Sequence, residues 1–493
     1  MRLLLATLAL LVPATAAAVD HPCHTPAFFD QLTAPLGPAV VIDATPRDKD
    51  SRNPYGVPNE LETENFVIRW GNSWSENTSG IDNLAAALED AWDTEIVDMS
   101  HPAPWSADQL LINVYIGDTG GGTPGSFGAG GYFNQDESGY PMLVIAPQSL
   151  DDLPWTRVVA IHEFYHAVQW GLGTYTYSEG EPGAWYWEAT ASWVPSEVDP
   201  DSPANISFLW GFALAAHLPL DAFDYPDSGQ LQEYHQYGAA IFPTYVSEHV
   251  ADWQPIRNSW VAPAGGTSDP IEALRGELAD LGEDFDAVFT DFVAHNVFWD
   301  YAHGNVFEQF VSGGQQAYPG TDPVTAWITD EGTGAPDEPP MRYGSNTVRF
   351  DLDDGTWRID LAFDDVGSAG NPASWGVTLV TDDGADISYT PIEVVDGAAS
   401  FELHSDGDEA GLAVASWTGP RSGGERFDWS WDVTFVEPPG DDDDDDTAPF
   451  GDDDDDVGGF SGNGCGCSAT SDAAPAAWLL LLLPFSRRRR PRP

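Results

Sequence analysis

The chain has 493 residues, of which 42% are hydrophobic and 12% aromatic, so it can bury a substantial core and is not a disordered protein. Its 80 acidic residues against 18 basic ones give a formal net charge of -62. A surface of this sign repels nucleic acid and anionic lipid, which excludes nucleic-acid binding. Because single hydrophobic cores stop growing at about 250–300 residues, we expect two folded domains plus tails.

The N-terminus has the pattern of a secretory signal. Arg2 precedes the apolar run of residues 3–12, and Ala16 and Ala18 supply the small residues of an A-x-A cleavage site. We therefore predict a signal peptide at residues 1–18 and an exported protein. Residues 19–60 contain scattered prolines and short apolar runs. Sequence alone leaves open whether they form a pro-segment or an N-terminal extension of the next domain.

Residues 61–338 are predicted to form one domain in which strands come first and helices follow. The glycine-rich stretch of residues 117–131 has no Gly-x-Gly-x-x-Gly that opens a helix, so we expect a mobile loop and not a phosphate cradle. Apolar patterning predicts strands at residues 65–70, 110–116 and 140–146, and helices at residues 81–98, 156–170, 184–194, 237–250, 270–281 and 285–298.

Two of these helices have clear end signals. Asp151 or Asp152 can accept hydrogen bonds from the first N–H groups of the helix at residues 156–170, and Gly173 can end it. The following helix is expected to stop at Pro195, because proline interrupts a helix.

Residues 340–437 have the pattern of an all-β domain, which makes the predicted fold class α+β. Seven short segments of alternating character are separated by Asp/Gly turns and predict a β-sandwich. They lie at residues 347–352, 356–363, 375–381, 387–389, 399–404, 412–417 and 427–435.

Residues 438–464 are predicted to be an acidic, unfolded linker. Two pure aspartate runs, at residues 441–446 and 452–456, contain no apolar side chain and repel one another. Ca²⁺ is a further cofactor candidate for these runs, although calcium loops interleave acids with glycine at set positions and these runs do not.

Residues 465–493 are predicted to be a sorting or anchor segment. Cys465 and Cys467 precede an apolar run at residues 473–485, which is shorter than the about 20 residues that span a bilayer. Arginines at residues 487–490 follow it and would stay in the cytoplasm, leaving the rest of the chain outside. We expect contact with a membrane through this tail only.

This order of cysteine, short apolar segment and arginine cluster resembles the myxobacterial C-terminal sorting signal of the MYXO-CTERM type. The resemblance implies processing or lipidation at Cys465 or Cys467. It also implies retention at the cell surface or outer membrane, or extracellular release after C-terminal processing. An ordinary weak stop-transfer anchor is the alternative.

The helix at residues 156–170 contains the motif His162-Glu163-Phe164-Tyr165-His166. Positions i and i+4 of a helix share one face, so both imidazoles can bind one zinc ion. Glu163 can reach a water activated by that ion and take its proton as general base. The motif therefore predicts zinc-dependent hydrolysis. Two histidines on an ordinary helix are the simpler alternative.

A catalytic zinc needs a third protein ligand and an open position. The metzincin continuation requires glycine and histidine where this chain has Gln169 and Leu172, so that branch is excluded. Another solution places a glutamate on a following helix. Glu188 lies on such a helix, where Ala189, Ala191 and Ser192 would permit close approach to the motif.

The pattern H-E-x-x-H followed by E-A-x-A-x-W, over residues 155–195, resembles the gluzincin metalloproteases. The resemblance implies a zincin-like domain with Glu188 as third ligand, and Glu179 and Glu181 as weaker candidates in a Gly/Pro loop. Gluzincins of the thermolysin type often carry an aspartate four residues after the glutamate to orient a histidine. This chain has Ser192 there. The whole architecture resembles a family of myxobacterial surface metalloproteases.

Other parts of the cleft are less strongly indicated. Tyr234, His235 and Tyr237 are candidate transition-state stabilisers, although a core or surface role is the better interpretation of each. By analogy with zincins, the strand at residues 140–146 would be the edge strand that binds substrate, with the glycine-rich loop gating access.

We therefore predict a monomeric zinc endopeptidase that acts on a protein or peptide substrate outside the cell. The alternative is a non-catalytic surface adhesin with a structural metal site. A structural site would need a fourth protein ligand. The sequence offers only three candidate ligands, which would leave one position of the metal open, and this favours catalysis.

Overall fold

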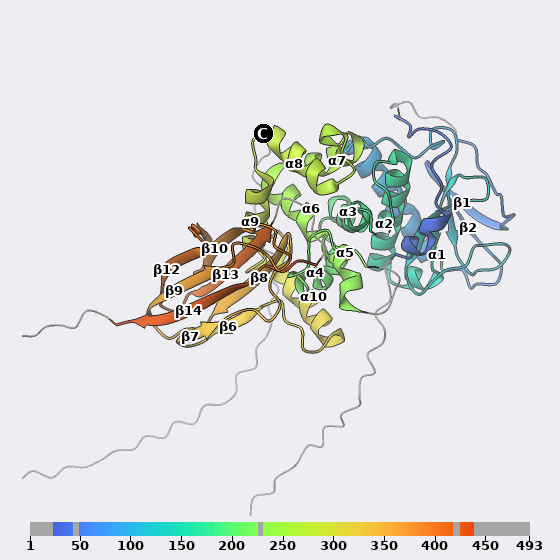
Figure 1. The fold of residues 1–493 in the computed structure, drawn as a ribbon. Coiled ribbons are helices and arrows are strands. Elements are labelled where there is room, and N and C mark those ends of the chain that lie inside the picture. The colour runs from blue at the N-terminus through green and yellow to red at the C-terminus, as the bar shows by residue number, and fades with distance from the viewer. Residues whose placement is uncertain (1–22, 43–48, 179, 225–229, 418–423, 438–493) are drawn as a thin grey trace, which may run out of the picture. The chain divides into compact units, whose positions relative to one another are not determined.

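The computed structural model describes residues 23–42, 49–178, 180–224, 230–417 and 424–437, all of which lie in one compact unit (Figure 1). Helices and strands are both abundant, as expected of an α+β protein. The predicted signal peptide, acidic linker and sorting tail, including Cys465 and Cys467, lie outside the described residues. Among the described helices, none combines the length and apolar character needed to cross a membrane.

A five-stranded mixed sheet forms the N-terminal part, in the order β1-β2-β3-β5-β4. Strands β2, β3 and β5 run parallel, while β1 and β4 pair antiparallel at the two edges. The bounds are β1 Asn59–Glu62, β2 Phe66–Trp70, β3 Ile112–Ile116, β4 Gly131–Gln135 and β5 Pro141–Ile145.

The strand predicted at residues 140–146 is β5, and its expected place at the edge is wrong. It lies inside the sheet, between β3 and β4. The edge is formed by β4, which directly follows the glycine-rich stretch and has no separate sequence signal. Order within a sheet depends on pairing between distant segments, so strand patterning could not fix it.

Helices α1 (Thr78–Trp92) and α2 (Leu153–Leu172) pack on each other and on this sheet. The Asp152 side chain caps α2 by accepting a hydrogen bond from Trp155 N (3.1 Å), and Gly173 ends it with a left-handed φ of 61°. The ring of Phe164 contacts those of Phe66 and Trp92, with centroids 5.0 and 6.0 Å away. Helix α2 is buried from Val158 to Gly171.

Helix α3 (Ala184–Val198) runs through Pro195, so the predicted stop there is wrong. Proline removes only its own N–H, and the helix continues for one short turn that Asp199 N closes on Pro195 O (2.9 Å).

The helix predicted at residues 237–250 is broken into α5, α6 and a π-helical turn, Val246–Ala251. Pro243 lacks the N–H that a continuous helix would need there. The remaining helices are α4 Leu209–Ala213, α5 His235–Gly238, α6 Ile241–Tyr245, α7 Gln254–Val261, α8 Pro270–Asp280, α9 Phe285–His295 and α10 Gly304–Ala317.

Two further sheets follow, in the orders β11-β10-β13-β8-β6 and β12-β9-β14-β7. Each predicted strand segment is present. Strands β6 and β7 were not predicted, and they place the start of the sheets before residue 340. The bounds are β6 Ala326–Ile328, β7 Gly332–Gly334, β8 Gly344–Phe350, β9 Gly355–Phe363, β10 Ser374–Asp382, β11 Ile387–Pro391, β12 Ala398–Ser405, β13 Glu409–Trp417 and β14 Trp429–Val436.

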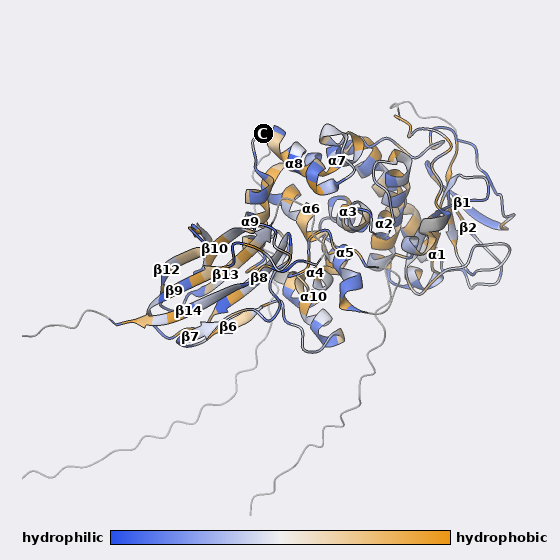
Figure 2. Cartoon of the chain, viewed as in Figure 1, coloured by the Kyte–Doolittle hydropathy of each residue, from blue (hydrophilic) through white to orange (hydrophobic). Residues whose placement is uncertain are grey.

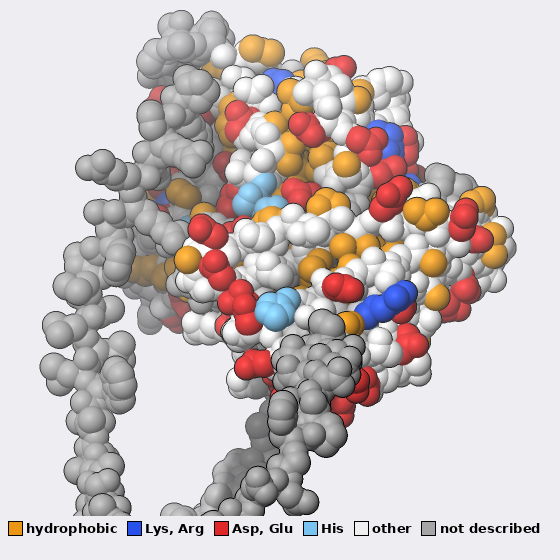
Figure 3. Space-filling view, turned by 90° about the vertical axis from the view of Figure 1, so that its left-hand side faces the viewer, with side chains coloured by type: hydrophobic (Ala, Val, Ile, Leu, Met, Phe, Trp, Pro, Cys, Tyr) orange, Lys and Arg blue, Asp and Glu red, His pale blue; other side chains and the backbone are white. Residues whose placement is uncertain are grey.

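Alternation of hydrophobic and hydrophilic residues along these strands gives the two sheets one shared core (Figure 2). Helix α9 packs on β10 and β13. The Tyr389 hydroxyl donates to Asp300 Oδ2 (2.7 Å), and its ring stacks on His295 with centroids 4.4 Å apart. On the face shown in Figure 3, acidic side chains are spread over the surface and basic ones are few.

Candidate metal centre

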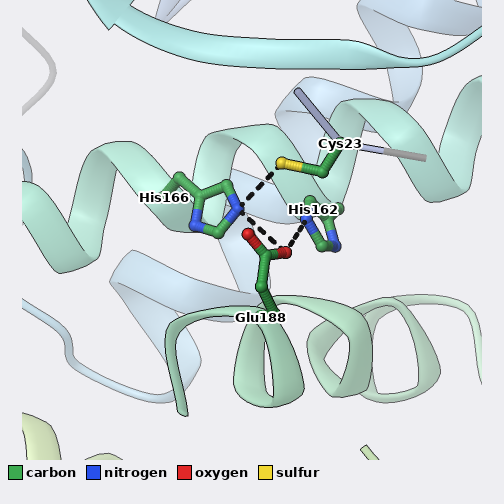
Figure 4. A group of neighbouring side chains, drawn as sticks. All are labelled: Cys23, His162, His166 and Glu188. Atoms are coloured by element: carbon green, nitrogen blue, oxygen red, sulfur yellow. Dashed lines mark hydrogen bonds and ion pairs between the residues drawn. The ribbon is translucent and has the colours of Figure 1, made fainter. Parts of the chain in front are cut away.

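Four buried side chains from three segments converge on one point (Figure 4). His162 and His166 project from α2, Glu188 comes from α3, and Cys23 comes from the N-terminal segment. One ligand atom of each lies within 4.8 Å of all the others. The sequence predicts the convergence of three of these residues but not of Cys23.

The separations between donor atoms fit a tetrahedral metal site. His162 Nε2 and His166 Nε2 lie 3.2 and 3.6 Å from Glu188 Oε2, and Cys23 Sγ lies 3.3 Å from His166 Nε2. Ligands about 2.0–2.3 Å from a tetrahedral ion are separated from one another by about 3.3–3.7 Å. Neither His162 Nε2 nor Glu188 Oε2 makes a hydrogen bond, as expected if both direct a lone pair at a common ion. The cluster could therefore bind a metal.

A hydrogen-bond relay fixes the orientation of the His166 ring. The Gln169 amide donates from Nε2 to Trp187 O and to Thr190 Oγ1, each at 2.9 Å. Its Oε1 must therefore accept from His166 Nδ1–H, 2.7 Å away. That leaves the lone pair of His166 on Nε2, the atom that faces the other donors. Gln169 lies one helical turn after His166, so helical spacing alone could have identified it.

The second histidine has a weaker orienting partner. Ser192 Oγ lies 3.4 Å from His162 Nδ1. The position at which thermolysin-type proteins often carry an aspartate is thus adjacent to the histidine, but it offers a neutral hydroxyl instead of a carboxylate.

The Glu188 carboxyl is held by Tyr177, whose hydroxyl donates to Oε1 and leaves Oε2 directed at the two histidines. The Tyr177 ring stacks on Trp187 with centroids 4.7 Å apart. Burial alone would raise the pKa of Glu188, but the neighbouring His166 and His162 bring it well below its ordinary value. Glu188 is therefore the anionic ligand of the set.

Glu163 lies beside these donors but is not one of them. It is fully buried, and burial raises the pKa of its carboxyl. Its Oε2 accepts a hydrogen bond from Thr25 Oγ1 (3.1 Å) and lies 3.7 Å from Cys23 Sγ, while Oε1 has no partner. A buried carboxyl of raised pKa next to a metal site is suited to accept and return a proton.

The other residues singled out in the sequence take different places. Tyr237 is at the site, with its ring centroid 6.3 Å from that of His162. His235 packs on Phe212, and burial lowers its pKa to about 3, which disfavours its charged form. Tyr234 packs among aromatic rings, with Trp210 at 4.7 Å. Glu181 is exposed and outside the cluster, and Glu179 lies outside the described residues.

A family model, described as a family of unknown function, matches residues 33–418. The chain belongs to the DUF6055 family. The residues matched to DUF6055 include the HExxH motif and Glu188, while Cys23 precedes them.

Comparison with curated proteins gave no match. Among solved structures, the pre-peptidase C-terminal domain of collagenase from Bacillus anthracis is similar over 23% of this chain and 98% of that one. The identity is 14% and the TM-score 0.15.

The role of Gln169 in orienting His166 for metal binding can be tested by mutation. Gln169→Leu removes the acceptor that fixes the His166 tautomer, so we expect metal affinity to fall by about 10–100-fold. Competition with a chromogenic chelator measures this loss. Gln236→Leu is the matched control, since Gln236 is also fully buried but contacts Asp224. Equal affinity in the wild type and in Gln169→Leu would show that the relay does not support a ligand.

Proposed function

We propose that the chain is a zinc-dependent endopeptidase with a zincin-like catalytic domain. The observation that carries this proposal is the placement of Glu163, a buried proton acceptor beside a His-His-Glu set of metal ligands. Zinc is the metal that this combination of nitrogen and oxygen donors suits in hydrolytic sites. A mixed sheet with an antiparallel edge strand, the motif helix and a glutamate on the next helix supports the zincin-like assignment.

Each surrounding group has a role in this proposal. Zinc bound by His162, His166 and Glu188 would supply Lewis-acid chemistry and lower the pKa of water. Glu163 would accept the proton of the attacking water and deliver it to the leaving amine. The Tyr237 hydroxyl would donate a hydrogen bond to the carbonyl oxygen of the bond being cleaved.

Two surfaces next to the centre would hold the peptide. The outer edge of β4 would pair with an extended substrate backbone, the role predicted for β5 from the sequence. A largely apolar pocket borders His162 and is lined by residues that include Val159, Phe208 and Ile241. It would accept an apolar side chain of the substrate.

A structural metal site in a non-catalytic surface protein is the second candidate. Cys23 favours it, because a fourth donor closes the tetrahedron, and the sequence-based argument that only three ligands exist is wrong. A purely structural site gives no reason for a carboxyl such as Glu163 to be buried beside it.

Zinc content and proteolysis of the full exported chain test the proposal. We expect one zinc per chain by elemental analysis, and casein cleavage that a chelator abolishes and added zinc restores. The assay uses the wild type and a Cys23→Ala variant, which lacks the fourth candidate ligand. Bound zinc with no cleavage by either protein would contradict the endopeptidase and favour the structural site.

A further inference from the structure

The N-terminal segment of the described chain occupies the candidate centre. Cys23 is fully buried, 140 residues before Glu163 in the sequence, and completes the donor cluster (Figure 4). The nearby atoms His162 Nε2 and Glu188 Oε2, which make no hydrogen bond, are also buried. Cys23 is the only cysteine between residues 19 and 437, so no disulfide partner within that part of the chain explains its position.

The backbone after Cys23 lies against the outer edge of the first sheet, which is strand β4. Cys23 forms a parallel bridge with Gly131 of β4, and His24 N donates to Gly131 O (2.9 Å). Phe133 N donates to Thr25 Oγ1 (2.8 Å). The chain then turns into the 3-10 helix Thr25–Gln31. Edge groups of β4 that could hold a substrate backbone are therefore already paired.

The same segment engages the groups that the proposed reaction needs. The Thr25 hydroxyl donates to Glu163 Oε2 (3.1 Å), so the proton acceptor is occupied. The Tyr237 hydroxyl donates to the carbonyl oxygen of Cys23 (3.3 Å), which places that carbonyl where a substrate carbonyl would be bound. With the segment in place, Glu163, His166 and Glu188 are inaccessible to solvent. The segment thus resembles a bound peptide with a thiol directed at the metal ligands.

We propose that residues 23–31 are an inhibitory segment and that the Cys23 thiolate is a removable fourth ligand of the metal. The inference rests on the proposed function, since inhibition presupposes an activity. The Cys23 thiol loses its proton to solvent when it binds the metal. When the segment is removed, water takes the fourth ligand position, and neither step is a redox reaction. The family match begins at residue 33, after the segment.

The first test is spectroscopic and independent of activity. The full chain is prepared with Co²⁺ in place of zinc and with Cys465→Ser and Cys467→Ser, so that Cys23 is its only thiol. A thiolate-to-cobalt charge-transfer band in the near ultraviolet is expected, and Cys23→Ala should abolish it while one Co²⁺ per chain remains bound. The same band in Cys23→Ala would overturn the ligand assignment. Loss of the metal together with the band would show an irreplaceable structural ligand and overturn the inhibitory role.

Thiol labelling and proteolysis complete the test. Iodoacetamide should label Cys23 much faster after chelation than in the zinc-bound chain. Cys23→Ala with zinc bound should cleave casein at least about tenfold faster than the wild type. Without the thiol ligand, a larger fraction of the molecules has a metal site that substrate can reach. Equal cleavage by both proteins would overturn inhibition and leave the endopeptidase intact. A thiolate band without cleavage by either protein would instead contradict the proposed function and leave Cys23 as a ligand.

Discussion

Replacing Glu163 by Gln is expected to lower kcat on a casein-derived peptide by about 10²–10⁴-fold, the usual contribution of a positioned general base. The amide keeps the volume of the buried side chain and can still accept from Thr25 Oγ1, but it cannot take a proton. Because Glu163 is not one of the converging donors, the variant should retain one zinc per chain. The comparison is made in the Cys23→Ala background, where the thiol proposed as the inhibitory fourth ligand is absent.

A matched control separates the loss of a general base from the general effect of replacing a buried carboxyl group. Glu95 is also fully buried, its carboxyl has no partner and burial raises its pKa well above the ordinary value. Glu95→Gln should therefore leave both kcat and zinc content unchanged. If Glu163→Gln cleaves the peptide as fast as its parent while zinc is bound, Glu163 is not the base and the proposed mechanism is wrong.

Local periodicity predicted the parts of the site that lie within one or two helices. His162 and His166 are one helical turn apart, and the capping residue Asp152 and the terminator Gly173 marked their helix. Glu188 is implied as third ligand by the resemblance to the gluzincins, and the small residues after it fit that role because they permit two helices to approach closely. These signals are encoded in neighbouring residues, which is why they could be identified without a structure.

Contacts between distant segments could not be predicted in this way. Nothing in the residues around Cys23 indicates that it meets a helix 140 residues later. The edge position of β4 is similarly a property of strand pairing and not of its own short sequence. The available signal for Cys23 was its isolation, as a single cysteine in a segment that the sequence left open as a pro-segment or an N-terminal extension.

Gln169 shows a different kind of omission. Its residue type served only to exclude the metzincin branch, although its place three residues after His166 put it on the same helical face. A structural role in orienting a ligand could therefore have been predicted from spacing. A residue that does not match one family's motif can therefore still have a structural role, because its side chain still faces the same neighbours.

Removing the Glu188 carboxylate is expected to have the largest effect on metal binding. Changes to groups that merely orient a ligand cost about 10–100-fold in affinity, so loss of an anionic ligand should exceed about 100-fold. Glu188→Ala removes the hydrogen bond from the Tyr177 hydroxyl to Glu188, and this loss can destabilise the fold by itself. Glu188→Gln is therefore the decisive variant, because its amide oxygen can still accept from Tyr177 but carries no charge. Zinc affinity is measured by competition with a chelator.

Thermal denaturation gives an independent measure of the same site. A ligand at about 1,000 times its Kd stabilises the folded state by about 4.1 kcal/mol, so chelation should lower the Tm of the wild type clearly. Glu188→Gln should show little change in Tm on chelation, because little zinc is bound at the start. Glu181→Gln, at an exposed carboxylate outside the cluster, should behave as the wild type does. If chelation lowers the Tm of Glu188→Gln as much as that of the wild type, the stabilising ion is bound elsewhere, because the uncharged amide cannot replace a carboxylate among buried donors at no cost.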